Sequence, residues 1–549
     1  MTFNSPMFHS ITRNATKALI YTLLCSLLSA CFLPGKISTL KTKNGTLIGT
    51  DNGEVKAFLG VRYAEPPVGN LRWAPPKPLL EGRGFKPAFL SGAGCVQGGS
   101  PTGVFHTSED CLYLDIWAPS EPGNYPVMVW LHGGGLLIGS GSELQYRGEK
   151  LAQEKKVIVV NVNSRLSFMG YVASPELSAE SAYAGSGNQG FLDQIEALKW
   201  VKSQIHHFGG DPENITLFGE SGGAIGVCTL ITSPLADDLF HKAILQSGSC
   251  RMLRTPNLAG GETKGKTFFD KIGCGNAEDP LTCGRALPIE KIVDSLAIDT
   301  NEIFLEHPDD WAYYPTPNLD GHFLSEHPIS LIEKGSKPDI PILIGTNKNE
   351  GSLFVGLRDH SENESDYLNY LRKFYGSLAG DFAQVYPLSN YAGAGEAAAA
   401  LAGDGFMDCP AKEMGSLMSD TQHPVYMYQF VQPVNSITTD IILELQKGKN
   451  APAWGVFHSA EIPYVFGVAS VLGNLDTPER KQTKDIIMSY WANFAYTGNP
   501  NGDGLPPWPE FNSQTTRYML LGEEFNTAAN LKPTQCDFWL NTFFAQGHW

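Results

Sequence analysis

The sequence predicts an α/β fold in which helices flank a large, mostly parallel central sheet. Short apolar runs rich in β-branched and aromatic residues recur along the chain, at residues 127–131, 157–160, 215–218, 243–245, 342–344 and 425–430. Such runs are typical of strands that are buried on both faces of a parallel sheet. Helical patterns lie between the runs, and this alternation of strands and helices defines the α/β class.

Three segments show the helical patterns most clearly. Residues 191–205 repeat apolar side chains at helical spacing, and the Ala-rich residues 392–402 are most simply part of a helix. Near the C-terminus, Thr477 and Pro478 form a good N-cap and first-turn pair. The helix that they begin has an apolar face made of Ile487, Tyr490, Trp491 and Phe494.

The domain organisation follows from length and from the absence of linkers in the sequence. At about 150 residues a domain, a chain of 549 residues allows three or four domains. From residue 36 onward, however, we find no long Ser/Pro/Gly linker, charge block or internal repeat. We therefore expect residues 31–549 to form a single domain, preceded by a signal peptide at residues 1–30.

Composition excludes two broad classes of protein. Hydrophobic residues make up 42% of the chain, which supplies ample core and excludes global disorder. The 40 Lys and Arg against 57 Asp and Glu give a net charge of −17. Because such a surface repels phosphate backbones, nucleic acid is not expected as a partner.

The N-terminus has the features of an export signal. Arg13 and Lys17 precede an apolar run at residues 18–28, which is too short to span a bilayer. The run ends in Leu-Ser-Ala-Cys31, which resembles the lipobox of bacterial lipoproteins, where the cysteine becomes the lipidated first residue. We expect an exported protein that Cys31 anchors to a bacterial membrane, the outer membrane or the periplasmic face if the source is Gram-negative. The alternative is ordinary cleavage beside a chance cysteine.

Two glycine-rich segments follow predicted strands and indicate nucleophilic catalysis. Residues 219–223, Gly-Glu-Ser-Gly-Gly, fit G-x-S-x-G directly after the run at 215–218, so Ser221 would stand on a strand–turn–helix elbow. Residues 132–135, His-Gly-Gly-Gly, follow the run at 127–131. Glycines there let backbone N–H groups approach a developing oxyanion. For each segment the alternative is a structural glycine turn.

Longer motifs around these segments resemble the type-B carboxylesterase and cholinesterase family. The residues at 208–223, FGGDPENITLFGESGG, resemble its serine signature, and those at 109–119, EDCLYLDIWAP, its second signature. Similar stretches are FLGVRYA at 58–64, PPVG at 66–69 and QSGS at 246–249. The resemblance covers nearly all of the chain after the signal segment, and it implies the α/β-hydrolase fold.

The resemblance also implies the other members of a Ser-His-Glu triad. The triad acid falls in GTNKNEGS at 345–352, which points to Glu350, although Asn349 stands where the family usually has Asp. The histidine motif is matched by GVFHSAEIP at 455–463, which points to His458. The implied oxyanion donors are the N–H groups of Gly134, Gly135 and Gly222, the last in place of a common Ala.

Further features that the resemblance implies are structural. Glu220 and Ser247 are family-like residues near the histidine, and we leave both outside the catalytic set. Two ion pairs, Arg72 with Glu109 and Arg165 with Asp193, are most simply structural. The implied disulfides are Cys95–Cys111, Cys274–Cys283 and Cys409–Cys536. Of ten cysteines these leave Cys228 and Cys250, which we expect to be small buried thiols, besides Cys25 and Cys31 in the N-terminal segment.

The leading hypothesis is therefore a serine carboxylic-ester hydrolase that acts on a small-molecule ester through an acyl-enzyme. One alternative is a catalytically silent adhesion or scaffold protein of the same fold. Another is hydrolysis of amides, carbamates or thioesters, since acyl-enzyme chemistry is shared. No cofactor and no metal are expected. Oligomeric state stays open, as do the pocket walls, because the loops at 290–340 and 355–425 cannot be placed from sequence.

Overall fold

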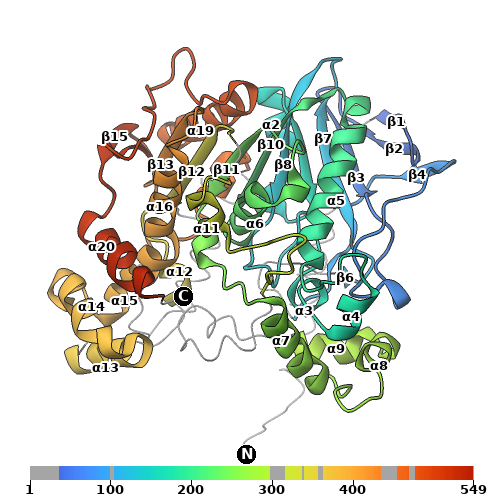
Figure 1. Ribbon diagram of the computed structural model, residues 1–549. Helices are drawn as coiled ribbons and strands as arrows, with labels where there is room; N and C mark the ends of the chain where they lie inside the picture. Colours follow the sequence, from blue (N-terminus) through green and yellow to red (C-terminus); the bar gives the residue numbers. More distant parts are fainter. Residues whose placement is uncertain are drawn as a thin grey trace, which may run out of the picture.

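The computed structural model describes residues 36–98, 104, 106–296, 316–336, 339–355, 363–433, 454–468 and 477–547. Its centre is a twisted sheet in the order β1-β2-β3-β7-β9-β8-β10-β11-β12-β13-β14-β15, with β4 paired to β2 (Figure 1). Along the run β9-β8-β10-β11-β12-β13-β14 neighbouring strands are parallel to one another. The strands β1, β2, β3, β7 and β15 pair antiparallel with their neighbours in the order above, and β4 pairs in parallel with β2. The mostly parallel sheet that the apolar runs predict is therefore present.

The strands and helices have the following bounds. The strands of the large sheet are β1 (Lys36–Thr42), β2 (Gly45–Asp51), β3 (Val55–Arg62), β4 (Phe85–Pro87), β7 (Tyr113–Pro119), β8 (Tyr125–Leu131), β9 (Ile158–Val162), β10 (Gly210–Glu220), β11 (Lys242–Gln246), β12 (Ile342–Asn347), β13 (Val425–Phe430), β14 (Arg517–Leu521) and β15 (Asn526–Ala529). A small separate pair is formed by β5 (Gly94–Cys95) and β6 (Thr107–Ser108). The α-helices are α2 (Glu149–Lys155), α3 (Ser167–Gly170), α4 (Pro175–Glu180), α5 (Gln189–Gln204), α6 (Gly222–Thr232), α7 (Leu258–Lys271), α8 (Pro280–Ala286), α9 (Ile289–Leu296), α11 (Pro328–Glu333), α12 (Ser352–Val355), α13 (Glu364–Tyr375), α14 (Ala379–Val385), α15 (Ala394–Gly403), α16 (Cys409–Met418), α18 (Ile462–Val465), α19 (Pro478–Thr497) and α20 (Pro533–Phe538).

Two hydrophobic cores fill the two sides of the sheet. One core joins the sheet to α5, α6, α11 and α16, and the other joins it to α2, α18 and α19. The N-cap of α19 is Thr477, whose side chain accepts a hydrogen bond from the Arg480 N–H, as the Thr-Pro pair predicts. Two helical groups, α7–α9 and α13–α15, form separate clusters at the lower corners of Figure 1. They flank the end of the sheet where β10 and β12 finish.

Disulfides and buried ion pairs tie these layers together. The three implied disulfides are present, Cys95–Cys111, Cys274–Cys283 and Cys409–Cys536. The expectation of free thiols at Cys228 and Cys250 is wrong, because these two cysteines form a fourth disulfide. It joins α6 to the 3₁₀ turn Cys250–Met252, which follows β11.

Both implied ion pairs are present and buried. Arg165 and Asp193 lie 2.7 Å apart, and Arg72 lies 2.6 Å from Glu109. Arg165 also donates to the backbone oxygen of Ala74, and Arg72 to that of Gly284. These guanidinium groups are therefore paired and hydrogen-bonded, as buried charges must be, and they connect segments that are distant in sequence.

Within the described residues, no helix is long and apolar enough to cross a membrane. The same residues include no group of three or more His, Cys, Asp or Glu side chains that could hold a metal ion. The predicted signal segment and Cys31 lie outside the described residues.

Candidate active site

Ser221 stands on a strained turn between β10 and α6. Its φ of 54° and ψ of −119° are unusual for a residue with a side chain, and such strain persists only where the surroundings hold it. Its backbone N–H donates to the backbone oxygen of Gln246 at 2.9 Å, and its backbone oxygen accepts from the Ile225 N–H at 3.0 Å. A Cβ on Gly223 would lie 1.9 Å from the Leu131 oxygen, so only glycine fits there. This is the geometry of a nucleophile elbow.

The glycine loop after β8 lies against the start of α6. Gly134 and Gly135 have φ values of 104° and 62°, in the left-handed region that favours glycine. A Cβ built on Gly222 would lie 2.7 Å from the Gly135 nitrogen and 2.8 Å from the Leu136 nitrogen. The backbone of the loop and the first residue of the helix are thus in direct contact, beside Ser221.

Two neighbours hold this loop in place. His132 has its Nδ1 2.8 Å from the Gly133 oxygen, and burial lowers its pKa to about 4, so its ring is neutral. Gln97, in the loop closed by the Cys95–Cys111 disulfide, donates to the Gly139 oxygen and accepts from the Gly139 N–H. The disulfide loop therefore supports the far end of the glycine loop.

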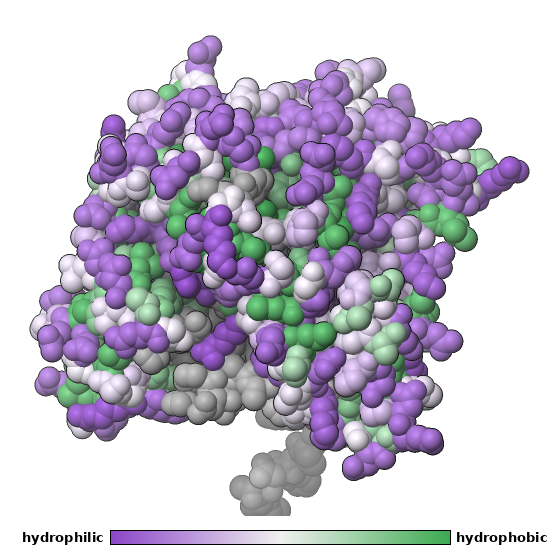
Figure 2. Space-filling view, in the orientation of Figure 1, coloured by the Kyte–Doolittle hydropathy of each residue, from purple (hydrophilic) through white to green (hydrophobic). Residues whose placement is uncertain are grey.

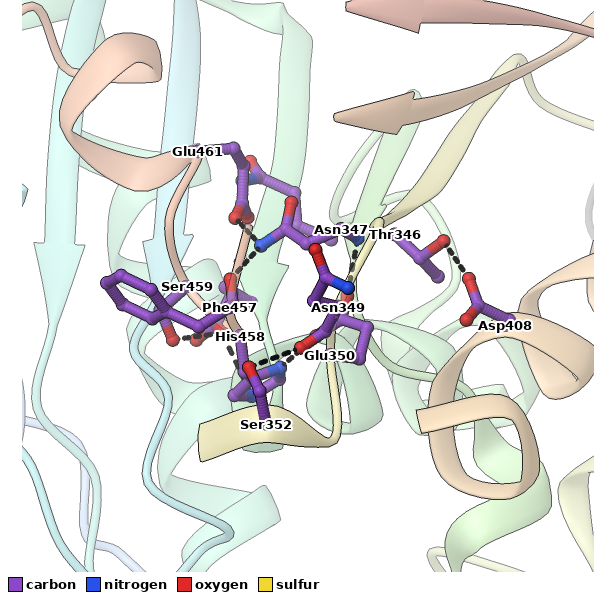
Figure 3. A network of polar contacts seen from close by, with 12 residues as sticks. Thr346, Asn347, Asn349, Glu350, Ser352, Asp408, Phe457, His458, Ser459 and Glu461 are labelled. Atoms are coloured by element: carbon purple, nitrogen blue, oxygen red, sulfur yellow. Dashed lines mark hydrogen bonds and ion pairs between the residues drawn. The ribbon is translucent and has the colours of Figure 1, made fainter. Parts of the chain in front are cut away.

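Glu350 and His458 form a close buried pair. Glu350 follows β12 and His458 precedes α18, and the side chains point toward each other in Figure 3, with Glu350 Oε2 2.6 Å from His458 Nδ1. The other oxygen of Glu350 accepts from the Asn347 N–H at 2.6 Å. The ring of Phe354 packs against the imidazole at 4.9 Å between centroids. The carboxylate and the imidazole are therefore both fixed.

A second carboxylate lies on the other side of the imidazole. Glu220 Oε1 is 3.1 Å from His458 Nε2, within ion-pair distance, yet Nε2 makes no hydrogen bond of good geometry to any described residue. Ser459 donates to the same Glu220 oxygen at 2.6 Å. The Ser221 hydroxyl itself makes no hydrogen bond with His458 within the described residues.

The charges around His458 shift its pKa upward. Burial alone lowers the pKa of an imidazole, but the negative charges of Glu220 and Glu350 outweigh it and raise the pKa of His458 to about 9. Burial has the opposite effect on a carboxyl group and raises the pKa of Glu220, while the charge of His458 opposes that rise. Displaced pKa values in one cluster are typical of functional sites.

Sequence reasoning missed a third buried carboxylate, Glu461, although it lies inside the histidine motif at 455–463. Its oxygens accept from Gln246 Nε2 at 2.9 Å and from Asn347 Nδ2 at 2.6 Å. Trp491 of α19 donates to Gln246 Oε1 at 3.0 Å. This chain of hydrogen bonds links the helix α19 to the segment that carries His458. No local pattern marks a glutamate as a partner of residues more than a hundred positions away.

Asp408 is a second residue that the sequence did not reveal. Its carboxylate accepts hydrogen bonds from Thr346 Oγ1 at 2.5 Å and from Lys532 Nζ at 2.6 Å. Thr346 lies in β12, four residues before Glu350, and Figure 3 shows its contact with Asp408. Burial raises the pKa of this carboxyl to about 7, and the Lys532 ammonium opposes the rise. Lys532 also binds Asp404, so one cation joins the C-terminal segment to residues 404–408, and Asp408 in turn contacts Thr346 of β12.

Asn349 occupies the position where the resemblance leads us to expect Asp. Its Oδ1 accepts from the Val456 N–H at 3.0 Å, and its own N–H donates to the Val456 oxygen at 2.9 Å. A Cβ on Gly455, whose φ is 54°, would lie 2.4 Å from Asn349 Oδ1. An amide oxygen accepts this bond as a carboxylate oxygen would, so the loop that carries Glu350 stays hydrogen-bonded to the loop that carries His458.

Fold and site together define a class of protein. A mostly parallel sheet with helices on both faces, a serine on the turn between a central strand and its helix, and a later acid and histidine constitute the α/β-hydrolase fold. A sequence profile of the Carboxylesterase family matches residues 36–539, and the chain belongs to this family.

Several characterised relatives are similar over most of their length. The para-nitrobenzyl esterase of Bacillus subtilis is 35% identical over 497 residues, 88% of this chain and 94% of its own. The fumonisin B1 esterase of Sphingopyxis macrogoltabida is 34% identical, over 89% of this chain and 87% of its own. The medium-chain fatty acyl-CoA hydrolase precursor of Anas platyrhynchos is 31% identical over 88% of each chain. The protein is a carboxylesterase.

Proposed function

We propose that this carboxylesterase cleaves small-molecule carboxylic esters through an acyl-enzyme on Ser221, with His458 as the general base and Glu350 as the residue that orients it. The buried Glu350–His458 pair, at 2.6 Å, is the observation that carries the proposal. With its Nδ1 bound to a carboxylate, the imidazole presents Nε2 as the nitrogen that exchanges protons. Glu220, which directly precedes Ser221, lies on that Nε2 side.

The reaction follows from these roles. His458 Nε2 removes the hydroxyl proton as Ser221 Oγ attacks the ester carbonyl, and Glu350 stabilises the imidazolium. The tetrahedral intermediate collapses, the C–O bond to the alcohol breaks, and the imidazolium returns its proton to the departing alkoxide. A water molecule, deprotonated by His458, then cleaves the acyl-enzyme and restores Ser221. In unliganded serine hydrolases the Ser–His hydrogen bond is often long and tightens only with substrate.

The proposed oxyanion donors are the backbone N–H groups of Gly134, Gly135 and Gly222. A Cβ on Gly222 would lie 2.7 Å from the Gly135 nitrogen, and this closeness of the two segments next to Ser221 supports the assignment. Preorganised N–H groups stabilise the charge that develops on the carbonyl oxygen, and the loss of one donor costs about 3 kcal/mol.

Two alternatives share the fold. A silent adhesion or scaffold protein would not need a serine on a strained turn or a buried acid–histidine pair. Amide, carbamate or thioester hydrolysis uses the same acyl-enzyme, and one relative carries the name of a fatty acyl-CoA hydrolase. Only the leaving group differs, so a panel of matched ester, amide and thioester substrates distinguishes these reactions.

Replacement of the nucleophile tests the proposal. We expect Ser221→Ala to lower kcat/KM for p-nitrophenyl esters at least a thousandfold and to abolish labelling by a fluorophosphonate probe. Ser203→Ala, on the exposed side of α5, is the matched control and should retain both. Activity within tenfold of wild type in Ser221→Ala refutes the nucleophile, and a wild-type protein that neither labels nor hydrolyses esters supports the scaffold alternative.

We also propose that the protein is exported and held on a bacterial membrane by lipid on Cys31. The support is the sequence alone, namely the apolar run at 18–28 that ends in Leu-Ser-Ala-Cys31.

A further inference from the structure

We propose that one face of the N-terminal sheet docks on an anionic lipid bilayer. This surface, called here the outer face, carries Ile37, Lys41, Ile48, Phe85, Pro87 and Phe89, from β1, β2, β4 and the residues after β4. The proposal does not depend on catalysis by Ser221 or on lipid at Cys31, so it can fail separately from either.

Strand register places the side chains of β1 and β2 on this face. In the antiparallel pair, Ile37 lies opposite Thr50 and Lys41 opposite Thr46. Directly opposed residues point to the same side of a sheet, and alternate residues along a strand share a side. Ile48 therefore joins the outer face, whereas Leu47 points to the other side and is buried in the core.

The same argument adds the residues of β4. This strand pairs with β2 in parallel, with Phe85 beside Thr46 and Pro87 beside Ile48. Ala88 is buried, its N–H donating to the Ile48 oxygen, and Phe89 follows with its side chain exposed, so the alternation continues. The apolar side chains thus form one continuous surface across neighbouring strands.

The outer face exposes apolar area that a folded protein normally buries. Ile37 is 72% exposed, Phe85 73% and Phe89 39%. These three are among the eight large apolar side chains that are exposed in the described part of the chain. Figure 2 shows apolar residues among hydrophilic ones at the right edge, where β4 lies in Figure 1. Contiguous patches of this kind mark interaction surfaces.

Charge identifies the partner as an anionic surface. Residues 36–90 hold nine Lys and Arg against four Asp and Glu, a net charge of +5, which falls to +3 once the pairs of Arg62 with Asp110 and of Arg72 with Glu109 are counted. Residues 91–549 hold 29 against 53, a net charge of −24. Lys41 shares the outer face by strand register, and Arg83 is exposed two residues before Phe85. Basic residues next to inserted apolar groups are the pattern of peripheral membrane binding. The same membrane repels the acidic remainder of the protein, residues 91–549. The protein should therefore bind with its outer face toward the bilayer.

The position of the face along the chain agrees with such an orientation. Five residue steps separate Cys31 from Lys36 at the edge of the face, and even a fully extended chain covers no more than about 18 Å over that length. An acyl chain on Cys31 would therefore hold the outer face close to the bilayer.

Vesicle binding without the lipid tests the proposal. The chain from residue 32 onward, exported behind a cleavable signal sequence so that it carries no acyl group, is sedimented with vesicles of phosphatidylcholine alone or with 30 mol% phosphatidylglycerol, a composition of about the anionic content at which such patches bind. We expect at least tenfold stronger binding to the anionic vesicles, and a loss of that preference at high salt.

Two variants and two matched controls locate the binding surface. Ile37→Ser with Phe85→Ser should weaken binding at least fivefold, and Lys41→Glu with Arg83→Glu at least tenfold. The controls change the same kinds of residue elsewhere: Leu144→Ser with Tyr496→Ser, and Lys266→Glu with Lys481→Glu. Both controls should bind within twofold of the starting chain, and all four variants should hydrolyse a water-soluble ester at its rate.

The contrary outcomes are distinct. Equal binding to neutral and anionic vesicles overturns the proposal, as does equal weakening by the control variants. A dimer in solution that the Ile37→Ser, Phe85→Ser variant converts to monomer, without vesicle binding by the starting chain, would assign the face to a second copy of the chain instead. Loss of esterase activity bears on the Ser221 proposal and not on this one.

Discussion

His458 lies between two carboxylates, and its protonation should govern activity. The general base must be neutral before it can accept the proton of Ser221. Because Glu220 and Glu350 hold the pKa of His458 at about 9, above the ordinary imidazole value, the base form becomes abundant only in alkaline solution. We expect kcat/KM of the wild-type protein to rise from pH 6 to pH 9.

Removal of one carboxylate tests whether these negative charges raise the pKa of His458. Glu220→Gln removes a negative charge from the Nε2 side of the ring, which stabilises the imidazolium less and lowers the pKa of His458. The acidic limb of the kcat/KM profile should move to lower pH by at least about one unit. The exposed Glu278→Gln is the control and should leave the limb in place. An unchanged limb in Glu220→Gln means that the titrating group is not the histidine beside this carboxylate.

Replacement of Gly222 by Ala, the residue common at this position in the family, should lower the activity of this protein. A Cβ at this position would lie within 2.8 Å of the Gly135 and Leu136 nitrogens, so Gly222→Ala must displace the glycine loop. We expect kcat to fall between tenfold and about a thousandfold, the upper limit being the loss of one oxyanion donor. Gly380→Ala, on α14 with open space around its Cβ, is the control. Full activity in Gly222→Ala would show that the glycine loop can move without losing its oxyanion donors.

The residues around the histidine show which part of the site a sequence can reveal. Ser221, Glu350 and His458 lie in contiguous motifs, because a sharp turn or a loop end needs particular neighbours. Asp408 contacts Thr346 across 62 positions, and Glu461 binds Asn347 across 114. Such contacts depend on where the strands finish, so no local pattern encodes them.

Among the elements, the buried parallel strands were predictable and the N-terminal strands were not. The run at 425–430 coincides with β13, and the run at 215–218 lies within β10, which begins earlier at Gly210. Continuous apolar runs identify strands that are covered on both faces. In β1 (Lys36–Thr42) most side chains are exposed, so its sequence carries no such signal.

The fourth disulfide illustrates the same limit and provides the prediction at this scale. Cys228 on α6 and Cys250 after β11 are 22 positions apart, and only the return of the chain from α6 through β11 brings them together. Closing a loop of this length stabilises the folded state by about 3 kcal/mol in the chain-entropy account.

Single and double variants distinguish a disulfide from two thiols. If the cysteines are bonded, Cys228→Ala, Cys250→Ala and the double variant all lose the same crosslink and should lower the free energy of unfolding by similar amounts, measured by denaturant titration. If they are free thiols, the two single effects should add, because each is then a separate small loss of packing. Additive effects, together with alkylation of both residues in unreduced protein, would contradict the structure.

At the scale of the whole molecule, charge and architecture separate two functions. The active site is built from the ends of β10 and β12 together with the residues before α18, all in the acidic part of the chain, whereas the basic outer face belongs to the first 55 described positions, 36–90. Figure 1 shows β1, β2 and β4 at one edge of the molecule, apart from the helices α13–α15 at the opposite side. Docking through the outer face would leave the catalytic residues unobstructed by the contact itself.

The lipid anchor supplies the last prediction. We expect the mature chain to begin at Cys31 with its thiol and amino group acylated, because residues 18–28 and Leu-Ser-Ala-Cys31 match a lipoprotein signal. Two or more acyl chains give stable membrane association where one is marginal. Mass spectrometry of the N-terminal peptide should show the acyl groups, and an inhibitor of lipoprotein signal peptidase should cause the precursor with residues 1–30 to accumulate. The Lys41→Glu, Arg83→Glu variant is the control and should be acylated as fully as wild type. An unmodified N-terminus at or after residue 31 would refute the anchor and leave the outer face as the only proposed membrane contact.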